Sequence, residues 1–159
     1  MMVLHPDSEQ AQEAIGRALA EACSTNCLIF LKGDLGAGKT TLARGFLRGW
    51  GHSGAVKSPT YTLIEPYEVE GRHCYHLDLY RLADPDELEY LGLRDLLSGE
   101  AVLLVEWPEQ GGDALPVPDV LVTINYQTNG REVRLVAQTA RGKGVLEALS
   151  TELGPSLQS

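Results

Sequence analysis

Residues Gly33–Thr40, GDLGAGKT, match the phosphate-loop pattern Gly-x-x-x-x-Gly-Lys-Thr, which is typical of α/β nucleotide-binding folds. The glycines permit backbone conformations in which successive N–H groups point at phosphate oxygens. The Lys39 ammonium is a mobile positive charge for the phosphates, and the Thr40 hydroxyl can ligate magnesium. A helix that begins near Lys39 adds its positive end. The stretch therefore predicts a loop that binds a nucleotide together with Mg²⁺.

The segments on either side of the loop have the order that this motif requires. Cys27–Leu31 is a short apolar run, typical of a strand buried on both faces. Thr40–Trp50 has helical periodicity, which Gly49 and Gly51 end. A chance match is the alternative interpretation, but the order of strand, loop and helix argues against it.

A hairpin is expected next, with Tyr61–Val69 and Arg72–Leu79 as strands and Glu70–Gly71 as the central turn residues. The pairs that follow from this register are Leu63 with Asp78 and Thr60 with Arg81. The hairpin therefore brings the Ser58–Thr60 segment to the same end as Asp78.

The remaining elements lie at both ends of the chain and around a second buried strand. The first helix is capped by Asp7, with Gln10 as its box partner, and is broken at Thr25–Asn26; a later helical segment is capped by Asp84, and a last helix covers Lys143–Leu153. An apolar strand is expected at Ala101–Val105. A second hairpin joins Val120–Tyr126 to Arg131–Thr139 through a turn at Asn129–Gly130, which places Ile124 opposite Leu135 and Val122 opposite Ala137. Together they predict one α/β domain over residues 1–159, a P-loop NTPase three-layer sandwich with a mixed parallel/antiparallel sheet and a disordered tail after about residue 153.

Composition limits the possible partners. The 159 residues carry 13 Lys and Arg against 22 Asp and Glu, a net charge of −9, with no basic run. Tight, unaided nucleic-acid binding is therefore not expected. No signal peptide or membrane span is indicated, so a cytoplasmic protein is expected. Cys23 and Cys27 are spaced for zinc, but no second Cys/His pair is near, and free thiols are the favoured interpretation.

Two carboxylates are candidate catalytic groups. A phosphate-loop enzyme needs an acidic side chain at the end of a neighbouring buried strand, and Glu106 follows such a strand. It is expected to hold Mg²⁺, with a merely solvated carboxylate as the alternative. Asp78 either orients or deprotonates the attacking water, joins the magnesium shell, or caps the turn before Tyr80. His76 lies two residues before Asp78 and is expected to be structural or hydrogen-bonding.

Three further features are less specific. Ser58–Thr62 follows a glycine-rich connection and is a candidate γ-phosphate-sensing segment, although it is also an ordinary strand entry. Trp107 is either an aromatic wall of the site or a loop-packing residue. Arg81 either contacts phosphate or a partner, or forms a surface salt bridge.

Two other functions are compatible with a phosphate loop. A small-molecule or nucleoside kinase is the main alternative to an ATPase, but it usually carries an Arg-bearing lid, and the arginines here are scattered. A GTPase switch is disfavoured because no Asn-Lys-x-Asp guanine-reading element is present.

Four motifs in order carry a resemblance to a known family. They are GDLGAGKTT at 33–41, SPTYTL at 58–63, HLDLYRL at 76–82 and VEWP at 105–108. Together they closely resemble the TsaE (YjeE) family, the small ATPase of bacterial tRNA threonylcarbamoyladenosine biosynthesis. The resemblance covers nearly the whole chain, and its DLYR and VEWP motifs are far more specific than the phosphate loop alone.

The resemblance implies roles for individual residues. Lys39, Asp78 and Glu106 would be catalytic, with Thr40 and Glu106 on the metal, and Ser58–Thr62 would be a nucleotide-sensitive switch. The residues implied to contact ATP are Gly33, Asp34, Leu35, Gly36, Ala37, Gly38, Lys39, Thr40, Thr41, Thr60 and Trp107. The N-terminal region would help to enclose the adenine.

The resemblance also implies partners. Members of the family act with a TsaB–TsaD complex, in which TsaD transfers threonylcarbamoyl to the adenosine beside the anticodon. A TsaE-like chain would hydrolyse ATP to reset that complex and would meet tRNA only through it, without a membrane. The acidic balance of this chain fits that division of labour.

Overall fold

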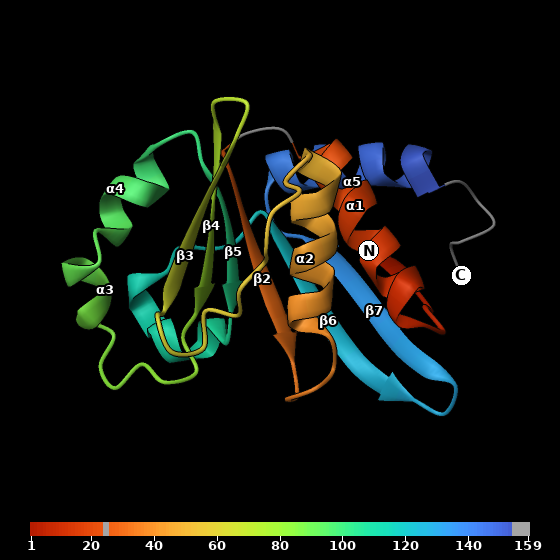
Figure 1. Cartoon of the computed structure of the whole chain (residues 1–159), viewed down its shortest axis with the longest axis horizontal. Coiled ribbons are helices and arrows are strands. Elements are labelled where there is room, and N and C mark those ends of the chain that lie inside the picture. Colours follow the sequence, from red (N-terminus) through yellow and green to blue (C-terminus); the bar gives the residue numbers. More distant parts are fainter. Residues whose placement is uncertain (24–25, 154–159) are drawn as a thin grey trace.

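A seven-stranded sheet forms the centre of the molecule (Figure 1), which is described by a computed structural model over residues 1–23 and 26–153. The strands are β1 (Met2–Leu4), β2 (Cys27–Gly33), β3 (Ile64–Val69), β4 (Arg72–Asp78), β5 (Val102–Glu106), β6 (Val120–Gln127) and β7 (Gly130–Ala137). Their order across the sheet is β1-β7-β6-β2-β5-β4-β3. The four central strands run parallel, and β1, β7 and β3 pair antiparallel. The predicted mixed sheet is confirmed.

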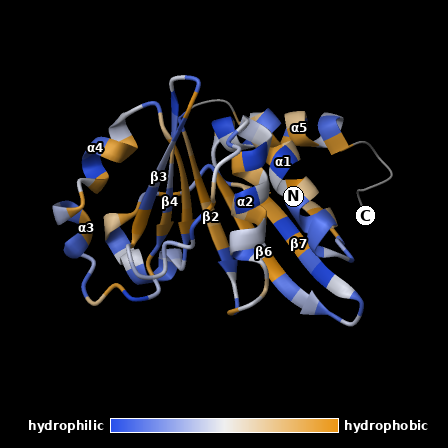
Figure 2. Cartoon of the chain, viewed as in Figure 1, coloured by the Kyte–Doolittle hydropathy of each residue, from blue (hydrophilic) through white to orange (hydrophobic). Residues whose placement is uncertain are grey.

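Helices cover both faces of this sheet. One face carries α1 (Glu9–Ala22), α2 (Lys39–Trp50) and α5 (Ala140–Leu153), and the other carries α3 (Glu87–Tyr90), α4 (Leu93–Ser98) and a 3₁₀ segment, Pro108–Ala114. Strand β5 shows why the core divides in two, because Val102 and Leu104 pack with the first layer and Leu103 and Val105 with the second. Figure 2 shows the hydrophobic residues gathered on the central strands. The three-layer α/β arrangement agrees with the prediction.

The carboxyl ends of three parallel strands meet at one edge, the lower edge in Figure 1. There β2 ends at Gly33, β4 at Asp78 and β5 at Glu106. Asp78 and Glu106 are directly paired in the β4–β5 ladder. Ligands in open α/β sheets bind at this kind of edge.

The β3–β4 hairpin has the predicted register but starts later. Val69 pairs with Arg72, and the Asp78 N–H donates to the Leu63 carbonyl at 2.9 Å. The predicted pairing of Thr60 with Arg81 is wrong, because β3 begins only at Ile64, and the residue before it, Leu63, has a positive φ of 68° that a strand does not allow. The segment before it forms turns, yet it still reaches the end of β4.

The predicted register of the β6–β7 hairpin is wrong by two residues. Ile124 pairs with Val133 and Val122 with Leu135, so the central turn residues are Thr128 and Asn129. The same faces stay buried because side chains alternate with a period of two. Gly130 serves another purpose here. A Cβ on Gly130 would lie 2.3 Å from the Pro6 carbonyl oxygen, which accepts a hydrogen bond from the Arg131 N–H.

Three predicted helix starts are also corrected. Helix α1 is capped by Ser8 rather than Asp7, because the Ser8 Oγ accepts the Ala11 N–H at 3.0 Å while its own backbone is extended. The helical segment expected from Asp84 begins at Glu87, after a turn that the Asp84 carboxylate closes. Helix α5 begins at Ala140, three residues before the predicted start.

Two of the sequence predictions concern residues that the structure does not describe. The tail after residue 153 and Thr25 of the predicted helix break lie outside the described residues. Cys23, Cys27 and Cys74 are buried free thiols. Within the described parts of the chain, no helix has both the length and the apolar character needed to cross a bilayer.

Candidate nucleotide site

The phosphate-loop stretch connects the end of β2 to the start of α2. Gly36 and Gly38 have φ angles of 81° and 107°, a region that L side chains rarely adopt. The glycine pattern is therefore explained by backbone geometry. The first N–H groups of α2 have no partner within the helix and form an anion-binding end, with Lys39 as the first helical residue.

Side chains from distant parts of the chain hold the outer side of this loop. The Gln12 amide of α1 is buried and donates to the carbonyl of Ala37 at 3.1 Å and to that of the next residue at 2.9 Å. The Arg131 Nε donates to the same Ala37 carbonyl at 3.2 Å. The Tyr126 hydroxyl donates to the Leu35 carbonyl at 2.9 Å. With these carbonyls bonded, the loop is braced in advance of any ligand.

Lys39 is held inside the site. Its Nζ donates to the Gly33 carbonyl at 2.5 Å and lies 3.8 Å from the centre of the Trp107 ring. Burial lowers the pKa of Lys39, while the charges of Glu106 and Asp78 act in the opposite direction. Trp107 has a left-handed backbone (φ 54°), an uncommon conformation for a bulky residue. Its side chain lines the pocket and also packs against the hydrophobic residues of the second layer, so it meets both of its predicted interpretations.

Glu106 is a buried carboxylate with two donors. Its Oε2 accepts from the His76 Nε2 at 2.6 Å and from the Thr40 hydroxyl at 3.2 Å. Only 3% of Glu106 is exposed, so the solvated carboxylate considered from the sequence is wrong. A buried carboxylate needs such donors to offset the loss of water.

Asp78 lies beside it and is held by different donors. The Tyr80 N–H donates to Oδ1 at 3.0 Å, and the Thr60 hydroxyl to Oδ2 at 3.3 Å. Asp78 therefore does close the turn before Tyr80, as one predicted alternative required. Burial raises the pKa of Asp78, and the Glu106 charge adds to this, whereas the two hydrogen bonds act against it.

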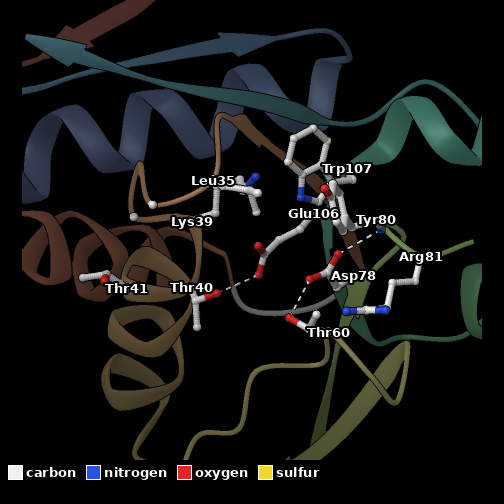
Figure 3. Close-up of a pocket in the computed structure, with 12 residues that line it drawn as sticks. Leu35, Lys39, Thr40, Thr41, Thr60, Asp78, Tyr80, Arg81, Glu106 and Trp107 are labelled. Carbon is white, nitrogen blue, oxygen red and sulfur yellow. Dashed lines mark hydrogen bonds between the residues drawn. The ribbon is translucent and has the colours of Figure 1, made fainter.

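These side chains line one pocket of about 450 Å³ (Figure 3). Its lining residues are Leu35, Gly36, Gly38, Lys39, Thr40, Thr41, Thr60, Asp78, Tyr80, Arg81, Glu106 and Trp107. In the close-up, Glu106 points toward Thr40, and Asp78 toward Thr60. Arg81 lines the pocket with its guanidinium 4.5 Å from the Tyr61 ring centre. The structure thus brings together residues that the sequence separates by more than sixty positions.

A neighbouring hollow of about 280 Å³ opens on the other side of the phosphate loop. Its lining residues are Pro6, Asp7, Ser8, Glu9, Gln12, Gly36, Ala37, Gly38, Thr41, Gly130 and Arg131. Ala37, predicted to contact ATP, lies here. Gly33 and Asp34 line neither hollow. Gly33 instead offers its carbonyl to Lys39, and the Asp34 carbonyl accepts the Ala37 N–H.

The residues present fit a magnesium ion. The Thr40 hydroxyl and the Glu106 carboxylate lie 3.2 Å apart in the pocket, and oxygen groups of this kind suit a hard cation. No group of three or more His, Cys, Asp or Glu side chains suited to a metal occurs among the described residues. A magnesium ion here would therefore complete its shell with phosphate oxygens and water, as is usual for Mg²⁺.

Sequence reasoning missed the residues that support the loop. Gln12, Tyr126 and Arg131 belong to no motif around the glycines, and they reach the loop only through folding. His76 was expected to be structural or hydrogen-bonding, and it is hydrogen-bonded to Glu106. Nothing in the sequence gives that pairing.

Comparison with known proteins decides the family. The family model described as "Threonylcarbamoyl adenosine biosynthesis protein TsaE" matches residues 6–135. The chain belongs to the TsaE family.

Relatives of this TsaE family member cover most of its length. The tRNA threonylcarbamoyladenosine biosynthesis protein TsaE of Haemophilus influenzae is 54% identical over 123 residues, which are 77% of this chain and 78% of the relative. The protein of that name from Bacillus subtilis is 37% identical over 139 residues, 87% of each chain. The crystal structure of Bacillus subtilis YdiB superposes with a TM-score of 0.83 at 30% identity and 96% coverage of both chains. The family assignment links the chain to tRNA threonylcarbamoyladenosine biosynthesis.

Proposed function

We propose that this TsaE family member binds ATP with Mg²⁺ in the pocket lined by Lys39, Asp78 and Glu106 and hydrolyses it for tRNA threonylcarbamoyladenosine biosynthesis. The observation that carries the proposal is the convergence of a phosphate loop with two buried carboxylates and a buried lysine. The phosphates belong against the loop N–H groups and Lys39. The second hollow, beside Gln12 and Arg131, offers room for the base and ribose.

The side chains divide the work of hydrolysis. Thr40 and Glu106 would hold the metal, which would supply positive charge against the phosphates. Asp78 orients the attacking water and accepts its proton. The raised pKa of this carboxyl makes it a stronger base than an exposed aspartate, and the Tyr80 N–H fixes its direction. Thr60 joins the predicted switch segment to Asp78, so movement of that segment would disturb the base.

Partner proteins are part of the proposal. Two large hydrophobic side chains at the pocket are exposed: Leu35, which lines it, at 64%, and Tyr61, which packs on the pocket residue Arg81, at 81%. Exposed apolar groups gathered at one place favour protein contacts. We assign them to a TsaB–TsaD-like complex, which would control hydrolysis and hold the tRNA, since this chain carries a net charge of −9.

Phosphate release from ATP tests the proposal. The purified protein should release phosphate slowly with Mg²⁺, and faster after addition of a purified TsaB–TsaD complex. Phosphate appearing on an added nucleoside or metabolite, without any response to that complex, would establish the kinase alternative and overturn the proposal.

A further inference from the structure

A buried histidine, His76, is hydrogen-bonded to Glu106, the proposed metal ligand. His76 lies on β4, is 0% exposed, and places its Nε2 2.6 Å from the Glu106 Oε2 on the neighbouring strand β5. It occupies the same strand face as Asp78, two residues earlier, so it lies deeper under the site edge. His76 does not line the pocket. Among the described residues, the hydrogen bond that joins it to a pocket residue is the one to Glu106, and it also acts electrostatically on Asp78.

The surroundings of the other His76 ring nitrogen, Nδ1, indicate that Nε2 carries the proton and is the hydrogen-bond donor. Its Nδ1 is the one buried side-chain nitrogen or oxygen without a hydrogen-bond partner among the described residues. A proton on Nδ1 would be buried with no acceptor, which is costly. The neutral imidazole with its proton on Nε2 avoids that cost and donates to the carboxylate.

A glutamate needs this support more than an aspartate would. Glu106 has an additional rotatable bond, and fixing it costs side-chain entropy. Its second donor, the Thr40 hydroxyl, is itself a proposed metal ligand, so its hydrogen bond to Oε2 would change when a cation enters. Of the two donors, His76 is the one that is not itself a proposed metal ligand, so its hydrogen bond would not have to change when a cation enters.

We propose that His76 is a positioning residue that donates its Nε2–H to Glu106 and holds that carboxylate in the orientation that accepts Mg²⁺. This inference rests on the proposed function, because it assigns Glu106 to the metal. Partners that orient a metal ligand contribute about 10- to 100-fold to metal affinity or activity. His76 should therefore act on the magnesium requirement and leave binding of the metal-free nucleotide unchanged.

Titration calorimetry of ATP at increasing Mg²⁺ is the first experiment. His76→Leu should raise the Mg²⁺ concentration for half-maximal enhancement of ATP binding about 10- to 100-fold. In excess chelator its ATP affinity should stay within about twofold of the wild type. His76→Gln, which can place an amide donor near the Nε2 position, should recover part of the loss. Cys74→Ala is the matched control, because Cys74 is a buried residue two positions earlier on the same strand face and does not line the pocket.

The outcomes separate the two proposals. Equal magnesium requirements in His76→Leu, Cys74→Ala and wild type overturn the role of His76 and leave the proposed function intact. A wild type whose ATP binding does not respond to Mg²⁺ refutes the metal assignment itself.

Nitrogen NMR of the metal-free protein gives a second readout that needs no stable variant at position 76. The ¹⁵N spectrum of the imidazoles should contain one buried ring protonated on Nε2, and Glu106→Gln should shift that signal. A ring protonated on Nδ1, or a signal unchanged in Glu106→Gln, would overturn the inference.

Discussion

Asp78 and Glu106 are paired residues on adjacent parallel strands, and both carboxylates enter the same pocket. Each is at most 5% exposed. Two buried like charges repel each other, and the cost falls when a cation lies between them. Lys39 already acts on both charges in the free protein, and in the proposed function a bound metal–nucleotide complex would lower the remaining repulsion.

The first prediction concerns this cost. Asp78→Asn should raise the unfolding midpoint of the nucleotide-free protein at pH 7 by about 2–4 °C, as expected for about 1 kcal/mol in a domain of this size. The amide can still accept from the Tyr80 N–H and meet the Thr60 hydroxyl. Differential scanning calorimetry without metal measures the shift.

The pH dependence of that gain follows from the sign of the pKa shift. The folded-state pKa of Asp78 is raised, so the wild type binds this proton more tightly when folded than when unfolded. The penalty is fully present above the folded pKa, shrinks as the pH falls below it, and is gone below the unfolded pKa. The advantage of Asp78→Asn should therefore shrink in the acid range, and a gain that grows on acidification would contradict the assignment.

The second prediction concerns Lys39. Lys39→Ala should weaken ATP binding by about 100-fold, as expected when charged hydrogen bonds worth up to about 3 kcal/mol are lost. Lys32→Ala is the matched control, because Lys32 is partly exposed, does not line the pocket, and pairs with the exposed Glu109 at 3.7 Å. Calorimetric titration of both variants measures the difference. Equal losses would move the phosphate site away from Lys39.

The third prediction tests the bracing of the loop. Tyr126→Phe removes one hydrogen bond to the Leu35 carbonyl and should weaken ATP binding about 2- to 10-fold. Tyr90→Phe is the control, since Tyr90 is 91% exposed on α3, away from the pocket. Both proteins should unfold at nearly the wild-type temperature. An unchanged affinity in Tyr126→Phe would show that the loop keeps its shape without this contact.

The fourth prediction concerns the β6–β7 turn. Gly130→Ala should destabilise the protein by more than about 1 kcal/mol, because its Cβ would meet the Pro6 carbonyl and its φ of 146° disfavours a side chain. Gly144→Ala, at an exposed position of α5 with nothing within 4 Å, should instead stabilise it by about 0.5–1 kcal/mol. Chemical denaturation measures both. Similar effects of the two substitutions would contradict the observed packing of Pro6 on the hairpin.

The sequence predicted the parts of this structure that depend on local pattern. Cys27–Leu31 is apolar because β2 is buried on both faces, and the two central glycines of the loop have positive φ. The register of the first hairpin followed from Glu70–Gly71, both of which have positive φ as a tight hairpin turn requires. Such features are set by neighbouring residues, so they can be inferred without the fold.

Contacts between residues far apart in the chain determine the features that the sequence did not predict. Asn129–Gly130 has the pattern of a hairpin turn, yet Gly130 is needed because Pro6 packs against it. Ser8 caps α1 in place of Asp7, although both residue types suit the position. The bond between His76 and Glu106 depends on strands that are adjacent in space and thirty residues apart in the chain. No local pattern carries that information.

Single-turnover kinetics measures ATP hydrolysis by this protein and the part that Asp78 takes in it. Wild-type protein in excess over ATP, with Mg²⁺, should convert the bound nucleotide to ADP and phosphate. Asp78→Asn should bind the same nucleotide with similar affinity and release phosphate about 10²- to 10⁴-fold more slowly, as expected when a catalytic base is lost. Wild-type ATP that stays intact, or Asp78→Asn that turns over at the wild-type rate, would contradict the account.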